Sequence, residues 1–167
     1  MIHTLAEFVE LWTPEAEATQ KVLKAITDKS LPFASGPEDR TVGRLAWHVV
    51  TTIPEMMGRT GLMFTGVSAE APVPGTAKEI SGAYDNAASA LLAQIKSSWT
   101  DESLQTEDNM YGEKWKRSQT LQVLILHQVH HRGQLTTLMR FAGLRVPGVY
   151  GPAREEWAAM GMKPPAV

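Results

Sequence analysis

The longest regular pattern in the sequence lies near its C-terminal end, where apolar positions recur at every third or fourth residue. This segment runs from Leu121 to about Phe141, and one stripe of it is formed by Leu124, His127, His131, Leu135, Leu138 and Ala142. Such a period predicts a long amphipathic α-helix with this stripe facing the protein core. We expect Ser118 or Thr120 to cap its start and Gly143 to end it. A helix of this kind must be packed against other elements to bury its apolar face.

Three more segments show the same helical period, and each begins at a threonine that can act as an N-cap. These starts are Thr4-Leu-Ala-Glu7, Thr41 and Thr76-Ala-Lys-Glu79, of which the first and third are capping boxes. Pro14 lies within the first segment, where it either kinks one long helix or opens a second one. No strand-like alternation is evident. The sequence therefore predicts an all-α four-helix bundle, with a single domain over residues 1–167 and a short extra C-terminal helix at 151–157.

Composition excludes several classes of function. Among 167 residues there are five histidines and no cysteine, and the formal net charge is −2. A disulfide, a thiolate metal site and a cysteine nucleophile are therefore excluded, and a transition-metal site must use His, carboxylate or water. No basic run indicates nucleic-acid binding, and no apolar run is long enough to span a membrane. With no signal-peptide pattern at the N-terminus, we expect a cytoplasmic protein that acts on a small molecule.

Two histidines lie in the predicted core-facing stripe, where a titratable ring needs a partner. His127 and His131 are four residues apart, a spacing at which two imidazoles on one helix can reach the same metal ion. The alternative is that both rings are core histidines satisfied by hydrogen bonds. His48 also steps with the apolar residues of its own helix, and a third inward imidazole favours a metal site with an open position. His130 could ligate instead of a neighbour, but it lies off the stripe, and His3 precedes the first helix.

These residues resemble the DinB/YfiT-like superfamily of helical-bundle metalloproteins. The strongest match is the string His127-x-x-x-His131-Arg-Gly-Gln134, and a second is the histidine within Leu45-Ala-Trp-His48. The resemblance implies a four-helix bundle, commonly a homodimer, that holds one divalent ion (zinc or nickel) through His48, His127 and His131. It further implies that Gln134 supports a ligand from outside the coordination shell, although a helix-packing role is equally compatible with this position.

Three functions remain open from the sequence. The resemblance extends to thiol-dependent S-transferases, in which a metal would activate a low-molecular-weight thiol. It also extends to hydrolases, for which Glu55, seven residues after His48, is the only carboxylate we nominate as catalytic. Pro54 can bend this helix, so the spacing alone does not place Glu55 on the same face as His48. The third possibility is a non-catalytic metal-binding stress protein, in which the metal is structural or the pocket only sequesters a ligand. A purely structural site would need a fourth protein ligand to close it.

Several neighbouring residues receive structural interpretations. Arg132 is expected to be an exposed salt-bridge partner, and Gly133 is expected to allow a close helix contact. The long polar connection Ser97–Arg117 is expected to be a surface loop, which either hides a short helix or covers the mouth of the site with Tyr111 and Trp115. The helically spaced methionines Met56, Met57 and Met63 are expected in the core.

Overall fold

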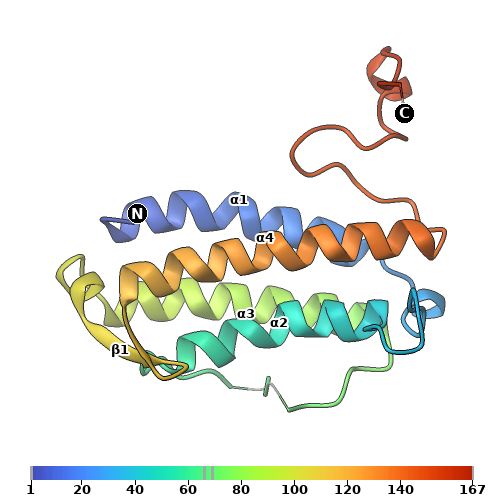
Figure 1. Cartoon of the computed structure of the whole chain (residues 1–167). Helices are drawn as coiled ribbons and strands as arrows, with labels where there is room; N and C mark the ends of the chain where they lie inside the picture. Colours follow the sequence, from blue (N-terminus) through green and yellow to red (C-terminus); the bar gives the residue numbers. More distant parts are fainter. Residues whose placement is uncertain (1, 66, 69, 167) are drawn as a thin grey trace.

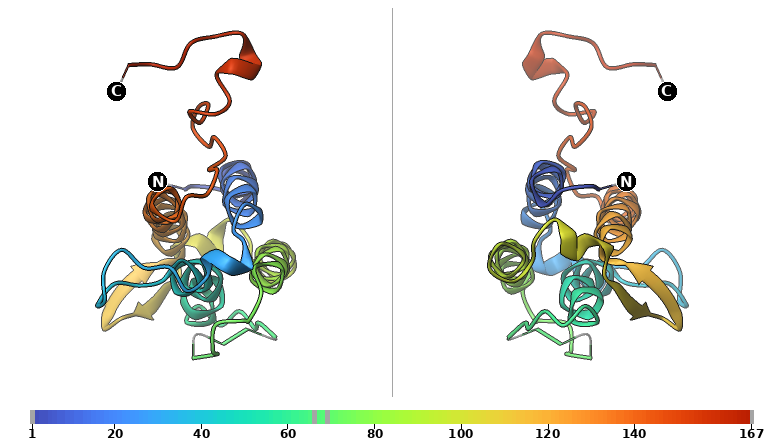
Figure 2. Two further views of the ribbon diagram at one scale, coloured as in Figure 1. Left: turned by 90° about the vertical axis from the view of Figure 1, so that its right-hand side faces the viewer. Right: turned by 90° about the vertical axis from the view of Figure 1, so that its left-hand side faces the viewer.

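The computed structural model describes residues 2–65, 67–68 and 70–166 and confirms the predicted four-helix bundle. Its helices are α1 (Leu5–Lys24), α2 (Val42–Gly58), α3 (Ala77–Ser98) and α4 (Arg117–Phe141). Figure 1 shows the four helices running alongside one another, and the end-on views of Figure 2 show them around a common core. Helix α1 packs on α3 and α4, and α2 packs on the same two helices, so α1 and α2 are diagonal neighbours. Each helix therefore buries two adjoining sides of its surface, one against each neighbouring helix, rather than one narrow stripe.

The predicted helix starts are confirmed at all three threonines. Thr4 and Thr76 form complete capping boxes, in which each hydroxyl accepts from the amide three residues on and the Glu there accepts in return. Thr41 caps α2 by accepting from the amide of Arg44 at 3.0 Å. Helix α1 continues through Pro14 and α2 continues through Pro54. Both prolines are thus accommodated inside single helices, which settles the question that Pro14 left open.

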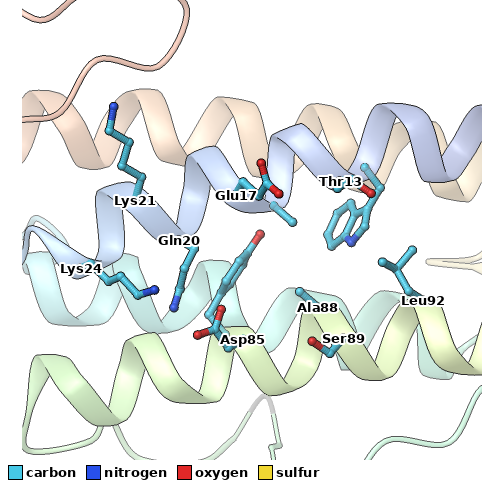
Figure 3. A pocket seen from close by; sticks show the side chains of 12 residues that line it. Thr13, Glu17, Gln20, Lys21, Lys24, Asp85, Ala88, Ser89 and Leu92 are labelled. Atoms are coloured by element: carbon cyan, nitrogen blue, oxygen red, sulfur yellow. The ribbon is translucent and has the colours of Figure 1, made fainter.

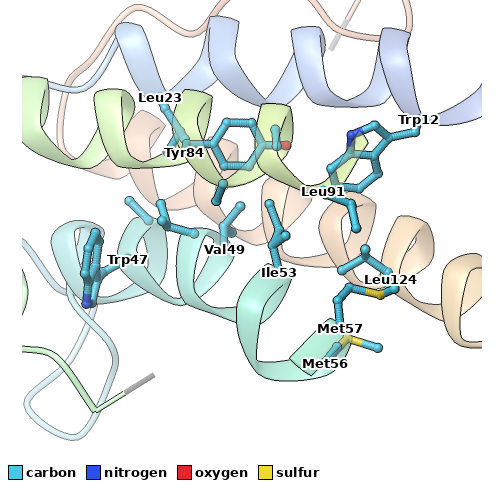
Figure 4. Packing of buried hydrophobic residues seen from close by; sticks show 14 of the residues in the cluster. Trp12, Leu23, Trp47, Val49, Ile53, Met56, Met57, Tyr84, Leu91 and Leu124 are labelled. Carbon is cyan, nitrogen blue, oxygen red and sulfur yellow. The ribbon is translucent and has the colours of Figure 1, made fainter. Parts of the chain in front are cut away.

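The core is built from large apolar side chains of all four helices (Figure 4). Trp12 of α1, Ile53 of α2, Leu91 of α3 and Leu124 of α4 are each fully buried. Met56 and Met57 are buried as expected, whereas Met63 is 82 % exposed. The expectation for Met63 is wrong because it lies beyond the end of α2, where the helical period no longer determines which side chains point inward.

The connection between α3 and α4 contains a β-hairpin that the sequence interpretation missed. A 3₁₀ helix, η2 (Glu102–Gln105), is followed by the antiparallel strands β1 (Glu107–Met110) and β2 (Glu113–Lys116). The two residues between the strands, Tyr111 and Gly112, have φ of 58° and 91°, as a two-residue type I′ hairpin turn requires. Met110 is fully buried, and it anchors the hairpin to the bundle. The expected short helix is thus present as η2, but the absence of strands was a wrong prediction.

Helix α4 also begins earlier than predicted, at Arg117, so Ser118 and Thr120 are buried inside the helix and do not cap it. Its predicted end is confirmed, since Gly143 has a φ of 76° and the amide of Leu144 donates to the carbonyl of Met139. Beyond Gly143 the chain continues past the end of α4 (Figure 1), and Val146 still packs against the core. The extra helix expected at 151–157 is replaced by a turn followed by a single 3₁₀ turn, η3 (Ala158–Met160).

Two short features complete the described chain. A 3₁₀ helix, η1 (Asp28–Ser30), follows α1, and the Asp28 carboxylate accepts from the amide of Ala77 at the start of α3. Within the described ranges, no helix has both the length and the apolar character needed to cross a membrane.

Candidate metal centre

Three imidazoles from two helices meet at one point, as the sequence predicted. His48 projects from α2, and His127 and His131 project from successive turns of α4. The Nε2 of His131 lies 3.1 Å from the Nε2 of His48 and 3.1 Å from the Nε2 of His127. The ligand atoms of all three residues lie within 4.8 Å of one another. The three rings are tilted or edge-on to one another, with interplanar angles of 60°, 63° and 87°. This arrangement aims nitrogens, rather than ring faces, at a common centre.

Hydrogen bonding at His131 decides which of its nitrogens carries the proton. The amide oxygen of Gln134 lies 2.7 Å from His131 Nδ1, and because that oxygen can only accept, Nδ1 must donate. The amide nitrogen of Gln134 in turn donates to His130 Nε2 at 3.1 Å. A neutral His131 therefore presents a lone pair at Nε2, the atom that faces the other two histidines. One lone pair cannot accept good hydrogen bonds from two rings at once, so protein contacts alone do not satisfy the cluster.

A divalent cation would satisfy the ring nitrogens that hydrogen bonding does not satisfy. Imidazole nitrogens bind zinc at about 2.0–2.1 Å, which in tetrahedral geometry separates two ligand nitrogens by roughly 3.3 Å. The observed separations of 3.1 Å are close to that value. The three histidines therefore fit one metal ion, and Gln134 supplies the outer hydrogen bond that typically orients a histidine ligand.

The protein also keeps these imidazoles neutral, which is the form that binds metal. Burial, followed by the neighbouring positive charges, lowers the pKa of His48 to about 4 and that of His127 to about 4. Burial likewise lowers the pKa of His131, and the hydrogen bond that its Nδ1 donates to Gln134 opposes this effect. Arg40 contributes to the lowering at all three rings. Neutral ligands at pH 7 follow from these shifts.

Glu55 lies beside the cluster but outside the group of metal-binding atoms. Its charge acts in the direction that raises the pKa of His127, opposing the effect of burial. Both of its carboxylate oxygens are already engaged: the hydroxyl of Tyr111 donates to one at 2.6 Å, and Arg59 donates to the other at 2.8 Å. The Arg59 guanidinium also lies 4.4 Å from the centroid of the Tyr111 ring. The hairpin that was missed in the sequence thus contacts Glu55 through the tyrosine of its turn.

The face of α4 differs from the predicted stripe. The deeply buried positions are Leu121, Leu124, Gln128, Arg132, Leu135 and Met139, whereas His127 and His131 are only partly buried at the flank next to α2. Arg132 was expected to be exposed, but its side chain is 3 % exposed and pairs with Glu15 of α1. Gly133 was expected to allow a close helix contact, yet a Cβ there would meet nothing within 4 Å. The expectation for Arg132 is wrong because α4 packs against two helices, so its buried arc is wider than the apolar residues indicate. The expectation for Gly133 is wrong because this residue lies on the exposed side of the helix.

A cleft with a volume of about 680 Å³ opens beside the cluster. His131 and Gln134 line it from α4, together with Gly133, while Arg40 lines it from the segment before α2. A second groove of about 520 Å³ lies between α1 and α3, with charged residues along its rim (Figure 3). No group of three potential ligands is found there in the described part of the chain. The cleft next to the histidines is therefore the candidate site for a substrate.

Comparisons with known proteins agree with this assignment of the fold. The chain matches the family model described as the DinB family over residues 1–165. It is 44 % identical over 165 residues to the uncharacterized protein YrdA of Bacillus subtilis (strain 168), which covers 99 % of both proteins. A crystal structure of a DinB-like protein from Bacillus cereus ATCC 10987 is 46 % identical and superposes with a TM-score of 0.86, covering 90 % of this chain and 100 % of that one. The DinB-like protein YjoA of Bacillus subtilis, at 17 % identity and a TM-score of 0.67 over 86 % of this chain and 97 % of that one, shares the fold. This chain therefore belongs to the DinB family.

Proposed function

We propose that this protein is a metal-dependent enzyme that transfers a small thiol to an electrophilic carbon, with zinc or nickel held by His48, His127 and His131. The observation that carries the proposal is the convergence of three neutral imidazoles at one point beside an open cleft. A purely structural site would need a fourth protein ligand, and the described residues bring only three side chains into the cluster. The remaining coordination position is then available to a small molecule from the cleft.

The surroundings of the cluster favour a thiol over water as the nucleophile. A divalent ion would lower the pKa of a thiol bound in its open position and so supply a nucleophile without a protein base. A hydrolase usually needs a carboxylate or imidazole to move protons as well. The nearby candidate, Glu55, has one oxygen occupied by Tyr111 and the other by Arg59. Those contacts leave it poorly placed to accept a proton from water.

The proposed step is balanced as a substitution. The sulfur of the thiol forms a bond to the electrophilic carbon, and the bond from that carbon to its leaving group breaks with both electrons going to the leaving group. The thiol proton passes to the leaving group or to solvent. No electron donor or acceptor is required, which suits a chain without cysteine. The neutral imidazoles of this chain hold the ion, and Gln134 keeps the His131 ring in the orientation that presents Nε2.

The first test is the metal content of the purified protein, measured by elemental analysis after incubation with zinc or nickel. We expect about one equivalent in the wild type and its loss in His48→Ala, His127→Ala and His131→Ala. His130→Ala is the matched control, because His130 lies on the same helix but outside the cluster, and it should retain the ion. Wild-type protein that stays metal-free would contradict the proposal.

The second test is the reaction itself. Metal-loaded wild type should accelerate the addition of a small thiol to a chromogenic aryl halide, and His131→Ala should lose the acceleration. Rates that are equal in the two proteins, at equal protein concentration, would contradict thiol transfer even if the metal site is real.

A hydrolase is the second candidate, and one observation favours it: the Glu55 carboxylate is close enough to influence His127. In that case Glu55→Gln should lose ester or amide hydrolysis while keeping one equivalent of metal. Hydrolysis that survives Glu55→Gln would remove Glu55 from the catalytic role that we first gave it.

A further inference from the structure

The residues that line the cleft next to the histidines are of two chemical kinds. The apolar ones are Leu45 from α2 and Leu138 and Phe141 from α4. Phe141 is 67 % exposed and so presents apolar surface to solvent. The segment before α2 contributes Arg40 to the lining, and α4 contributes His131. The cleft therefore offers a bound molecule apolar surface, a cation and one imidazole of the cluster.

Arg40 has no charge partner among the residues that the structure describes. Its guanidinium forms neither a salt bridge nor a hydrogen bond with any of them. The adjacent acid, Asp39, also lines the cleft, but its Oδ2 accepts from the hydroxyl of Ser35 at 2.6 Å. The charge of Arg40 reaches all three imidazoles of the cluster, whereas Asp39 is not among the groups that shift their pKa values. Of these two charged residues of the cleft, Arg40 is therefore the one whose charge acts on the cluster.

We propose that the small molecule that enters this cleft carries a carboxylate, which pairs with the guanidinium of Arg40 while its apolar part lies against Leu138 and Phe141. An arginine side chain matches a carboxylate with two parallel hydrogen bonds, and a single guanidinium balances a single negative charge. The pairing fixes one end of the ligand and directs the other end toward His131. This inference rests on the proposed function, since it names the class of molecule that the site accepts.

The test compares two thiols that differ in charge but hardly in size, 3-mercaptopropionate and 3-mercaptopropionamide. Isothermal titration calorimetry on metal-loaded protein gives the dissociation constant of each. In the wild type we expect the acid to bind about tenfold more tightly than the amide, the effect of one charge-assisted hydrogen-bonded pair. Arg40→Gln should abolish this preference and leave the affinity for the amide unchanged.

Arg44→Gln is the matched control. It removes a positive charge from the next turn of the chain, which also acts on His48, but Arg44 does not line the cleft. The preference for the acid should survive this change. Unfolding temperature and metal content, measured for each variant, show that both remain folded and loaded.

The outcomes separate this inference from the function on which it rests. Equal affinities of the acid and the amide for the wild type would overturn the role of Arg40 and leave thiol binding intact. An equal loss of preference in Arg40→Gln and Arg44→Gln would overturn direct pairing, because only the general field of the charges would then matter. Failure of both thiols to bind the loaded wild type would overturn the proposed function, and the inference with it.

Discussion

The buried ion pair between α1 and α4 offers the sharpest test of the packing. Arg132 of α4 is 3 % exposed and Glu15 of α1 is 16 % exposed at their side chains. The guanidinium also donates to the Glu15 carbonyl at 2.9 Å, to the hydroxyl of Thr19 at 3.0 Å and to the hydroxyl of Tyr150 at 2.9 Å. Replacing Glu15 with alanine removes the countercharge and leaves the cation buried.

The size of the effect follows from these contacts. Removing one partner of a fully buried pair typically costs about 3–5 kcal/mol. In Glu15→Ala, Arg132 keeps three oxygen acceptors, and the Glu15 side chain is itself partly exposed to solvent. We therefore expect a smaller loss of unfolding free energy, of about 2–3 kcal/mol. For a chain of this size each kcal/mol shifts the unfolding temperature by about 2–4 °C, which predicts a fall of roughly 4–12 °C.

The assay is unfolding by heat and by urea, followed by circular dichroism, for Glu15→Ala, Glu155→Ala and Arg132→Met. Glu155 pairs with Arg140 at a more exposed place, with side-chain exposures of 32 % for Arg140 and 23 % for Glu155, so its loss should matter clearly less. Arg132→Met should also cost less than Glu15→Ala, because it leaves no cation in the interior and Glu15 can reach water. The reasoning is refuted if Glu15→Ala is no more destabilising than Glu155→Ala.

Three further predictions concern the site and its surroundings. Gly133→Ala and Gly82→Ala should each raise the free energy of unfolding by about 0.5–1 kcal/mol in urea titrations, since both glycines lie inside helices where a Cβ meets nothing within 4 Å. Of the two glycines, only Gly133 lines the cleft, so only its substitution should weaken thiol binding. A loss of stability in either variant would contradict the conclusion that the added Cβ meets no neighbouring atom. In chelator-treated protein, the unfolding temperature should fall as the pH drops from 6.5 to about 4, because His48 and His127 take up protons over that range in the unfolded chain but not in the folded one. A double replacement of these two histidines by glutamine should flatten this dependence. Tyr111→Phe should destabilise the protein by about 1 kcal/mol through the lost hydrogen bond to α2 while metal content stays at one equivalent; loss of the ion would make Tyr111 part of the metal site.

The histidine cluster could be predicted from the sequence because its geometry is mostly local. A spacing of four residues on a helix determines that His127 and His131 lie side by side, whatever the rest of the fold. Bringing His48 to them needs the packing of α2 on α4, which spacing along the chain does not show; the family resemblance implied this third histidine, and the structure brings the three together. The role of Gln134 was likewise implied by the resemblance, and its amide oxygen accepts from His131 Nδ1 in the structure.

The interior of α4 could not be predicted in this way. Gln128 and Arg132 are polar, so a hydrophobic pattern assigns them to the outside, yet both are buried in the structure. What satisfies them comes from other helices: the Gln128 amide donates to the carbonyl of Val49 on α2, and Arg132 pairs with Glu15 on α1. Partners at such distances along the chain leave no local signal. Consequently the predicted stripe was rotated toward the flank that carries the histidines.

The hairpin was missed for a different reason. Its turn uses Tyr111 and Gly112, whereas the usual sequence signal for a two-residue turn is Asn-Gly or Asp-Gly. A positive φ at a tyrosine has an intrinsic cost, and here the contacts of that tyrosine with Glu55 and Arg59 help to offset it. The sequence did show that the polar connection Ser97–Arg117 is unusually long. That length indicated either a functional segment or a hidden short helix, but it did not indicate a hairpin.

These differences have one consequence for function. The three candidate ligands lie on helices of the bundle. In contrast, Arg40, which lines the cleft, and Tyr111, which contacts the Glu55 carboxylate, lie on segments between helices. Segments of that kind can change in sequence without disturbing the core, so the same ligand set can be combined with different groups around it. If the proposed function holds, metal binding would depend on the bundle, and the choice of substrate would depend on its connections. For this reason the acid-versus-amide comparison at Arg40 tests the substrate-binding part of the proposal, which metal content alone does not test.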